Sequence, residues 1–564
     1  MIGRVGTLLG RVIGATMVFG AMVVALFPRT AIVALSTPLV LVTLVTVVAV
    51  TLLAPMPRWL GRLAASRWTA PTVALSGGAV ATALGELLRY PYGWDAAVIM
   101  SIAHAVDSGA ALPVWRYRYL SLYPNNFPLL ALDRMYVSLG SSLGLSGDAV
   151  GVAVNGVCLA ATLWLTFDVV RRLAGATPAL VASGFVMAFV GFSPWMAVPY
   201  TDLYAMPFLA AVPALAQRAW ARQGPRALTW WALAGASAGV AYLVKTTPAV
   251  ILVALVLAAL LRPARGARTP QGNTREATPA PEPLRGLRQL VPPRGQRAAR
   301  LARARLHTAA AVLGLLAAFF ATSAVGTAAA RSGSGVDLTR LQSAQSPPVL
   351  WWVADGMNEI QVGGHTRWGA YDREMVNAIA GRTQADMDSY ARSYIAARWQ
   401  ERGLVGMSAF YLDKTVWNWS DASFWAWGEG IDSLERPLAT ATGAVGLSAD
   451  LARELSQVNA PQGPYYRERM SVAQGLWIAL LLLGGLGLLR APVTGDLLLL
   501  ALATVGIGAF ILVFQGRSRY LLTFVPIIVA LCCSTLPSLP WRWRRRSASH
   551  PVAESERRAS GRPR

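Results

Sequence analysis

The chain has 564 residues, of which 54% are apolar and only 14% are charged. Soluble domains carry roughly 25% charged residues, so this composition excludes an ordinary soluble protein and favours one built into a membrane. The net charge of +23 suggests a nucleic-acid partner, but much of it lies in two arginine-rich tracts, 262–308 and 541–564, which form no folded basic surface, so no nucleic acid is expected.

Apolar runs of about 17–25 residues recur along the chain, and a helix of this length crosses roughly 30 Å of hydrocarbon. No small-residue cleavage site follows the first run, so it is expected to remain as a helix. The pattern predicts an all-α polytopic membrane protein of about twelve transmembrane helices, at 12–28, 31–54, 71–88, 148–170, 177–197, 204–220, 228–243, 247–261, 309–330, 472–490, 496–514 and 518–537.

The spans and loops divide the chain into successive parts. Two N-terminal helices occupy 1–70, and a transmembrane core, 71–261, carries a first outside loop at 89–147. The other parts are a basic loop at 262–308 whose composition predicts disorder, a span at 309–330, a mostly helical outside segment at 331–470, C-terminal spans at 471–540 and a basic tail at 541–564. Interfacial or helical stretches are expected at 96–106, 127–143, 384–403 and 410–427.

Arginine-rich loops predict the side of the membrane that each loop occupies, because cytoplasmic loops carry an excess of basic residues. Five basic segments fall on one side if 89–147 contains no span. They hold Arg58, Arg62 and Arg67; Arg171 and Arg172; Arg218, Arg222 and Arg226; the tract 262–308; and the tail 541–564. We therefore expect a multi-pass protein of the cytoplasmic membrane, with both termini in the cytoplasm and any chemistry on the extracytoplasmic side.

Asp95 is the first candidate for chemistry, just beyond the outer end of the third span. Pro91 and Gly93 break the helix there, and the neighbouring aromatic residues favour the headgroup level. A carboxylate at this place suits a general base that takes a proton from a hydroxyl acceptor. The alternative is an N-cap for the helix expected at 96–106.

Two further polar elements belong to the same side of the membrane. Tyr123 precedes Pro124 and the adjacent amides of Asn125 and Asn126, which offer donors and acceptors that complement sugar hydroxyls. Asp202 ends the element Tyr200-Thr201-Asp202 and is expected to face the same cavity. The alternatives are a turn and an N-cap for the first element and an N-cap for the second.

Three cationic residues also fall on the outer side, against the general bias. Lys245 lies in the turn between two short spans, where a compact point charge suits a phosphate; snorkelling to the interface is the alternative. Arg517 and Arg519 begin the last span, next to Tyr520, and guanidinium groups bind phosphate through two parallel hydrogen bonds.

Other chemistries lack a pattern in this sequence. Cys158, Cys532 and Cys533 lie in apolar runs and predict neither a disulfide framework nor a metal site. His365 stands alone in its segment, and one histidine does not make a metal centre. There is no Walker A sequence and no GxSxG elbow.

The order and sidedness of these elements resemble the GT-C superfamily of membrane glycosyltransferases, which draw sugars from polyprenyl-phosphate donors and include protein O-mannosyltransferases and the aminoarabinose transferase of lipid A. The resemblance covers most of 71–540. It rests on Asp95, Tyr123 to Asn126, Arg171-Arg172, Tyr200 to Asp202 and Tyr242 to Lys245, and, for a Gram-positive, actinobacterial-like branch, on Trp351-Trp352, Gly356 to Asn358 and Trp417 to Asp421. The chain departs from families with an acidic pair, because Asp95 stands alone.

The resemblance implies transfer of a sugar, with inversion at the anomeric carbon, to an envelope glycan, lipid or protein outside the cytoplasm. In that scheme Asp95 is the base and Lys245, Arg517 and Arg519 bind the lipid phosphate. The other substrate-binding residues would be Tyr123, Asn125, Asn126, Asp202 and Tyr520. No cofactor is expected, and the lone aspartate gives no support for a divalent metal.

Two other classes of function remain open at this point. A transporter or flippase for lipid-linked glycans would place polar residues along a path across the bilayer, whereas here they gather at the outer ends of the spans. A scaffold or sensor would use 331–470 as an outer domain, but this segment is rich in tryptophan and suited to the membrane surface.

Overall fold

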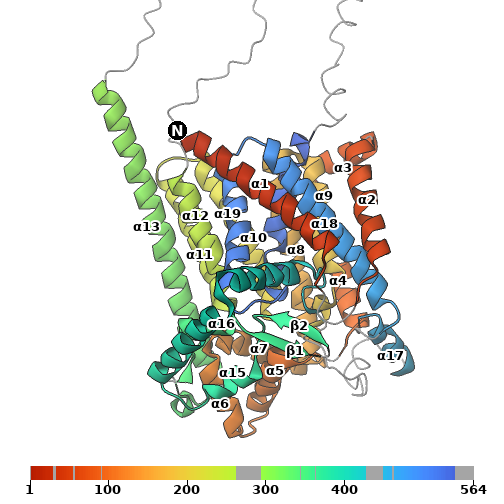
Figure 1. The fold of residues 1–564 in the computed structure, drawn as a ribbon, viewed down its shortest axis with the longest axis vertical. Coiled ribbons are helices and arrows are strands. Elements are labelled where there is room, and N and C mark those ends of the chain that lie inside the picture. Colours follow the sequence, from red (N-terminus) through yellow and green to blue (C-terminus); the bar gives the residue numbers. More distant parts are fainter. Residues whose placement is uncertain are drawn as a thin grey trace, which may run out of the picture.

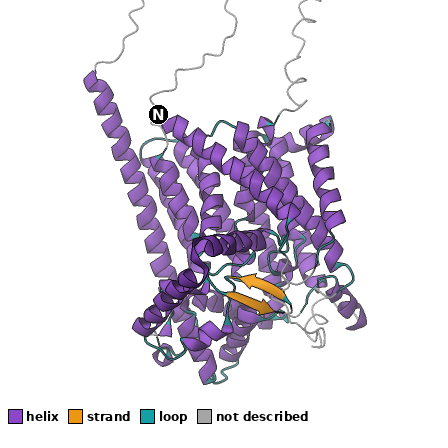
Figure 2. Cartoon of the chain, viewed as in Figure 1, coloured by secondary structure: helices purple, strands orange, loops and turns teal. Residues whose placement is uncertain are grey.

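The computed structural model describes residues 2–29, 34–54, 57–90, 92–261, 294–342, 345–362, 364–426, 449–459, 463–493 and 495–539. Helices dominate this part of the chain, as predicted (Figures 1 and 2). Among the described residues the one sheet is a hairpin of two antiparallel strands, β1 (Glu359–Val362) and β2 (His365–Trp368), in which Glu359 pairs with Trp368.

A helix occupies the position of every predicted span. These are α1 (Ile2–Leu26), α2 (Thr37–Leu53), α4 (Thr69–Leu87), α8 (Gly147–Ala174), α9 (Ala176–Val186), α10 (Thr201–Ala221), α11 (Pro225–Val244), α12 (Ala249–Leu260), α13 (Arg294–Gly333), α18 (Tyr466–Arg490), α19 (Gly495–Val513) and α21 (Val525–Thr535). Within the described ranges, six of them are long and apolar enough to cross a membrane: α1, α8, α11, α13, α18 and α19. The count of twelve spans stays a prediction.

The remaining elements lie between these helices or beside them, and most of them are short. They are α3 (Arg58–Ala65), α5 (Trp94–Asp107), α6 (Val114–Leu122), α7 (Phe127–Leu143), α14 (Val349–Asp355), α15 (Arg373–Ala378), α16 (Gln384–Trp419), α17 (Ala449–Gln457), α20 (Arg519–Leu522), and the 3-10 or π turns η1 (Pro124–Asn126), η2 (Met187–Gly191), η3 (Pro194–Ala197), η4 (Leu338–Arg340) and η7 (Leu536–Ser538). The stretches expected at 96–106 and 127–143 are helical, as α5 and α7, and α16 begins at Gln384 as expected.

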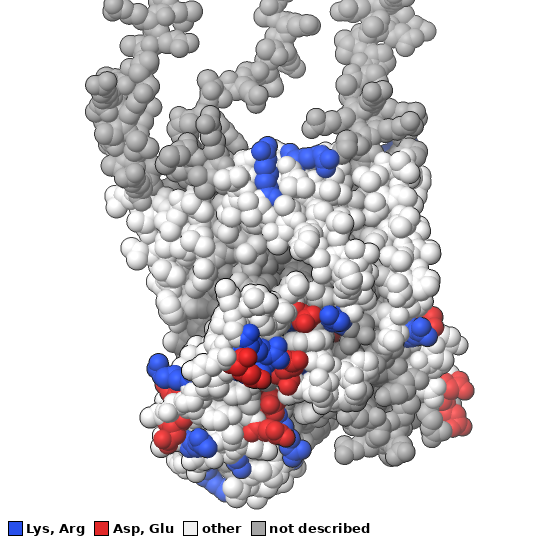
Figure 3. Space-filling view, viewed as in Figure 1, with Lys and Arg blue, Asp and Glu red and all other residues white. Residues whose placement is uncertain are grey.

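The distribution of charge fits a protein that lies in a membrane. Figure 3 shows a broad middle band of this face without charged residues, basic residues alone at one end and charges of both signs at the other. The second end holds α5, α6, α7, α15, α16 and the hairpin (Figure 1), together with α14, which packs against α16. We call it the loop-rich end. Apolar helices separated from charged ends in this way match the hydrocarbon and headgroup layers of a bilayer.

Close helix packing uses small residues, as is usual between membrane helices. Gly235 and Gly239 of α11 lie one turn apart and face α13. A β-carbon on Gly235 would lie 2.1 Å from the carbonyl oxygen of Leu315, and one on Gly239 would lie 2.8 Å from that of Phe319. The two backbones therefore touch at a place where only glycine fits.

Some sequence expectations differ from the structure or fall outside it. Residues 294–308, part of the predicted basic loop, form the first turns of α13, because their Ala, Arg, Leu and Gln residues are strong helix formers. Pro91, residues 262–293 of that loop and the whole C-terminal tail, 541–564, lie outside the described residues.

Candidate functional site

A cavity of about 590 Å³ lies at the loop-rich end, among residues from both halves of the chain. Its walls come from α5, α6 and η1, the start of α10, the turn between α11 and α12, α14, and the segment from α19 to α20. Eight of the nine predicted site residues line it: Asp95, Tyr123, Asn125, Asn126, Lys245, Arg517, Arg519 and Tyr520. The ninth, Asp202, does not.

Asp95 is held at one side of the cavity by two tyrosine hydroxyls. Tyr119 Oη donates to Asp95 Oδ1 over 2.7 Å, and Tyr200 Oη donates to Asp95 Oδ2 over 3.1 Å. Asn126 Nδ2 donates in turn to Tyr119 Oη over 2.8 Å. Each carboxylate oxygen can accept more than one hydrogen bond, so the orientation of Asp95 is set while capacity for an acceptor hydroxyl remains.

The N-cap alternative for Asp95 is wrong. The N-cap of α5 is Gly93, and Asp95 lies in the first turn with its carboxylate turned to the two tyrosines. Trp94, between Gly93 and Asp95 in the chain, has a φ of 49°, in the left-handed region. This conformation costs an ordinary residue about 1–2 kcal/mol. Backbone strain of this kind is concentrated at functional sites.

The wall next to Asp95 is aromatic and carries hydroxyl and amide groups. Tyr123 and Tyr371 share a hydrogen bond, and burial raises the pKa of both phenols, so both stay protonated. The ring of Tyr123 lies 6.3 Å from that of Trp352. Asn125 Nδ2 donates to Asn126 Oδ1 over 3.4 Å, so the two adjacent amides predicted to bind a sugar share one wall.

Lys245, Arg519 and Arg517 form the cationic side of the cavity. Lys245 Nζ lies 5.2 Å from the ring centre of Tyr520, and the guanidinium carbon of Arg519 lies 5.1 Å from that of Tyr200. Arg517 lies over Tyr371, at 5.8 Å. Tyr200 therefore joins the two sides, because its hydroxyl binds Asp95 while its ring lies under Arg519.

Asp202 lies behind the cations and not in the cavity wall, contrary to expectation. It has no exposed surface, forms an ion pair with Lys245, and lies 4.0 Å from Arg519 Nε. Thr523 Oγ1 also donates to it, over 3.1 Å. A buried carboxylate needs opposite charges beside it, and the two cations cover it. Asp202 can orient Lys245 and Arg519, but it has no surface to offer a sugar.

Several residues of the site carry no sequence signal of their own. Tyr119, Trp352 and Tyr371 line the cavity with Trp94 and Tyr200, yet aromatic residues are common wherever a membrane protein meets the interface. Tyr200 and Trp352 belong to elements singled out from the sequence, and Trp94 adjoins Asp95, but Tyr119 and Tyr371 do not. No group of three or more His, Cys, Asp or Glu residues suited to a metal occurs in the described ranges, and all three cysteines are free.

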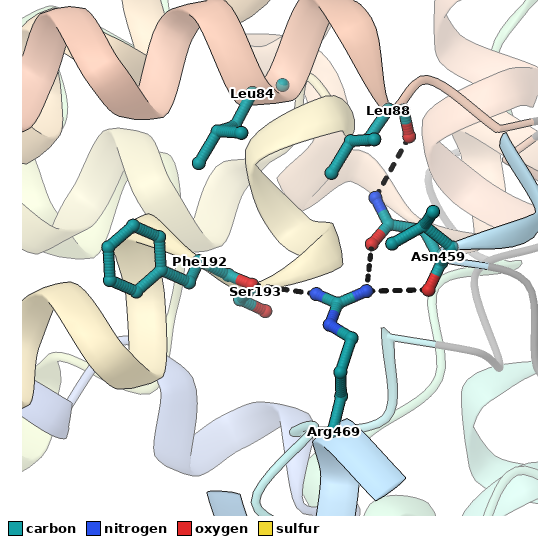
Figure 4. A pocket seen from close by; sticks show the side chains of 9 residues that line it. Leu84, Leu88, Phe192, Ser193, Asn459 and Arg469 are labelled. Atoms are coloured by element: carbon teal, nitrogen blue, oxygen red, sulfur yellow. Dashed lines mark hydrogen bonds between the residues drawn. The ribbon is translucent and has the colours of Figure 1, made fainter. Parts of the chain in front are cut away.

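A second cavity of about 200 Å³ lies between the end of α4 and the start of α18 (Figure 4). Arg469 lines it and donates to the carbonyls of Val458 and Phe192, at 2.6 and 3.1 Å, and to Asn459 Oδ1 at 2.9 Å. Asn459 Nδ2 donates to the carbonyl of Leu88 over 2.9 Å. The guanidinium group of Arg469 therefore binds groups of the protein, and we interpret these contacts as structural: they connect the start of α18 to the end of α4 and to Phe192.

The main cavity combines an oriented carboxylate with a cluster of cations. Such a site can bind an anionic group at one side and take a proton from a ligand at the other.

Comparison with known proteins identifies the family of the chain. A family model described as a conserved hypothetical integral membrane protein matches residues 13–538. No curated protein and no solved structure matches the chain. Since the family model spans nearly the whole chain, the chain belongs to this family of integral membrane proteins.

Proposed function

We propose that this protein is a membrane glycosyltransferase that moves a sugar from a polyprenyl-phosphate donor to an extracytoplasmic acceptor. One observation carries the proposal: Asp95, oriented by two tyrosines, shares a cavity with Lys245, Arg517 and Arg519. A sugar phosphate needs both features at once, a base for the acceptor and cations for the leaving group. The resemblance to the GT-C superfamily points the same way.

The reaction follows from the two sides of the cavity. Asp95 takes the proton of an acceptor hydroxyl as its oxygen forms a bond to the anomeric carbon. The bond from that carbon to the phosphate oxygen breaks, and its electron pair stays on the phosphate. Lys245, Arg517 and Arg519 stabilise this charge, as fixed cations do at a departing phosphate. Attack opposite to the leaving group inverts the anomeric carbon.

The remaining lining suits the other parts of such a donor. Tyr123, Asn125 and Asn126 offer hydroxyl and amide groups to the sugar. Phe510 and Phe514, at the end of α19, add apolar surface beside the cations, which suits the first part of a polyprenyl chain. Arg171 and Arg172 lie in the last turn of α8 and Arg218 in the last turn of α10, whereas the start of α10 lines the cavity. By the positive-inside rule, this arrangement supports a site on the extracytoplasmic side of the cytoplasmic membrane.

Transport of a lipid-linked glycan is the second candidate. It requires polar groups along a passage through the bilayer. The cavity gathers Asp95, Lys245 and Arg519 at one end of the bundle, and this arrangement favours transfer over transport.

The test uses purified protein in nanodiscs with radiolabelled polyprenyl-phosphate sugars. Asp95→Asn should lower the rate of transfer by about 10²–10⁴-fold, the usual contribution of a general base, and leave donor binding intact. Asp107→Asn is the matched control, because Asp107 lies exposed at the other end of α5 and away from the cavity. Transfer by Asp95→Asn at the normal rate would remove Asp95 from the mechanism. Failure of the unsubstituted protein with all such donors would refute the function.

A further inference from the structure

Helix α16 consists of two parts with different surroundings. The backbone leaves the helical conformation at Gly403, where φ is 60° and ψ is −174°. The two parts meet at an angle, and the second, residues 404–419, lies across the membrane-crossing helices at the loop-rich end (Figure 1). A left-handed φ suits glycine at such a break. The break therefore changes the direction of the chain from the outer segment to the side of the bundle.

The second part of α16 exposes large apolar side chains on one face. Leu404, Val405 and Leu412 are 74%, 83% and 54% exposed, and Ser408 and Ala409 lie between them on the same face. The opposite face is buried and carries Met407, Phe410, Lys414 and Trp417. A helix that is apolar on both faces is expected to contact a non-aqueous environment.

Lys414 attaches the second part of α16 to the rest of the protein. Its ammonium group has no exposed surface and donates to the carbonyls of Gly356, Leu512 and Phe514 over 2.6, 3.0 and 2.7 Å. Burial lowers the pKa of Lys414 to about 7, and three carbonyl acceptors match the three donors of the charged form. Residues 404–419 are therefore held in place, because Lys414 on their buried face binds backbone carbonyls at the end of α19.

The level of the helix is set by its contact with the end of α1. Arg29, just after that helix, forms an ion pair of 3.0 Å with Asp413, and its backbone N–H donates to Ser420 Oγ over 3.3 Å. Helix α1 is one of the six long apolar helices and ends at Leu26. The charged pair thus marks the headgroup level, where charged side chains remain hydrated.

We propose that residues 404–419 form an interfacial helix embedded in the leaflet at the loop-rich end, with Leu404, Val405 and Leu412 in contact with lipid acyl chains. The membership of the chain in an integral membrane family, the apolar face and the charged pair beside α1 together identify lipid as the occupant. A helix that lies in the plane of the interface buries its lipid-facing apolar side chains at the boundary between headgroups and acyl chains, while here the opposite face is covered by protein. The inference does not depend on the proposed glycosyl transfer.

The test places single cysteines at Leu404, Val405 and Leu412, labels them with bimane and reconstitutes the full chain into vesicles. Doxyl groups on the lipid acyl chains should remove most of the fluorescence, while iodide in the water should leave it. Ser389→Cys, exposed on the first part of α16, should show the reverse. The unsubstituted protein measures labelling of its native cysteines.

Two results would overturn the proposal. Quenching of the three sites by iodide would place the face in water. Protection from both quenchers would mean that protein covers it, either another segment or a second copy of the chain. Neither result would bear on the transfer reaction, which the assay with labelled donors tests separately.

Discussion

Replacement of Lys245 by methionine tests the ion pair behind the cavity. The substitution keeps the length of the side chain but removes its charge, and it leaves Asp202 buried without its closest partner. Arg519 at 4.0 Å and the hydroxyl of Thr523 at 3.1 Å would remain. These two contacts limit the loss of stability but do not replace the ion pair with Lys245.

Loss of one partner of a buried ion pair destabilises a protein by about 3–5 kcal/mol. Because two contacts to Asp202 remain, we expect a loss near the lower limit, about 3 kcal/mol. The double variant Lys245→Met with Asp202→Asn removes both charges, so it should be less destabilised than the sum of the two single variants. The measurement is unfolding of the four proteins in mixed micelles.

An exposed pair provides the control for this cycle. Arg29 and Asp413 are ion-paired with side chains that are 49% and 33% exposed, and such pairs contribute about 0.2–1 kcal/mol. The same cycle on this pair should therefore show little coupling. If the effects at Lys245 and Asp202 added to within about 0.5 kcal/mol, the two residues would not act as a buried pair, and the account of the cationic side would fail.

Four other substitutions have expected outcomes. Tyr119→Phe and Tyr200→Phe should each slow transfer about tenfold in the radiolabel assay, since each removes one hydrogen bond of about 1.4 kcal/mol from Asp95. Gly235→Leu should separate α13 from α11 and lower the melting temperature, because overpacking costs about 1–3 kcal/mol. Arg469→Gln should remove the hydrogen bonds of the guanidinium group beside α4. The free energy of unfolding should fall by about 1.5–3 kcal/mol.

Each of these has a matched control in the chain. Tyr465→Phe changes an exposed tyrosine away from the cavity, Gly314→Ala places a methyl group where nothing lies within 4 Å, and Arg467→Gln changes an exposed arginine of the same helix as Arg469. If a variant and its control changed the transfer rate or the stability equally, the role assigned to the corresponding contact would be wrong.

The site could be anticipated in part because of where a membrane protein can place charge. Charged residues are confined to the ends of spans, so Asp95, Lys245 and Arg519 were expected on one side of the membrane before their distances were known. Their pairing was not predictable. Asp202 and Lys245 are 43 positions apart, and nothing local distinguishes a carboxylate that faces a cavity from one that lies beneath a lysine.

The contribution of the outer segment was also beyond sequence reasoning. Tyr371 follows the hairpin and Trp352 lies in α14, and both reach the cavity only because the loop-rich end folds over the bundle. The break at Gly403 was anticipated as the end of a helix, yet the chain continues there as a second helix in another direction.

The sequence by itself determined the membrane class, the positions of the apolar helices and the expected side of the site, since these depend on hydrophobicity and charge along a local stretch of chain. Only the tertiary structure decided that Asp95 is held by Tyr119 and Tyr200, that Asp202 is covered by Lys245 and Arg519, and that eight of the nine predicted residues share one cavity. These are contacts between distant segments, and packing and buried charge select them after the helices have formed.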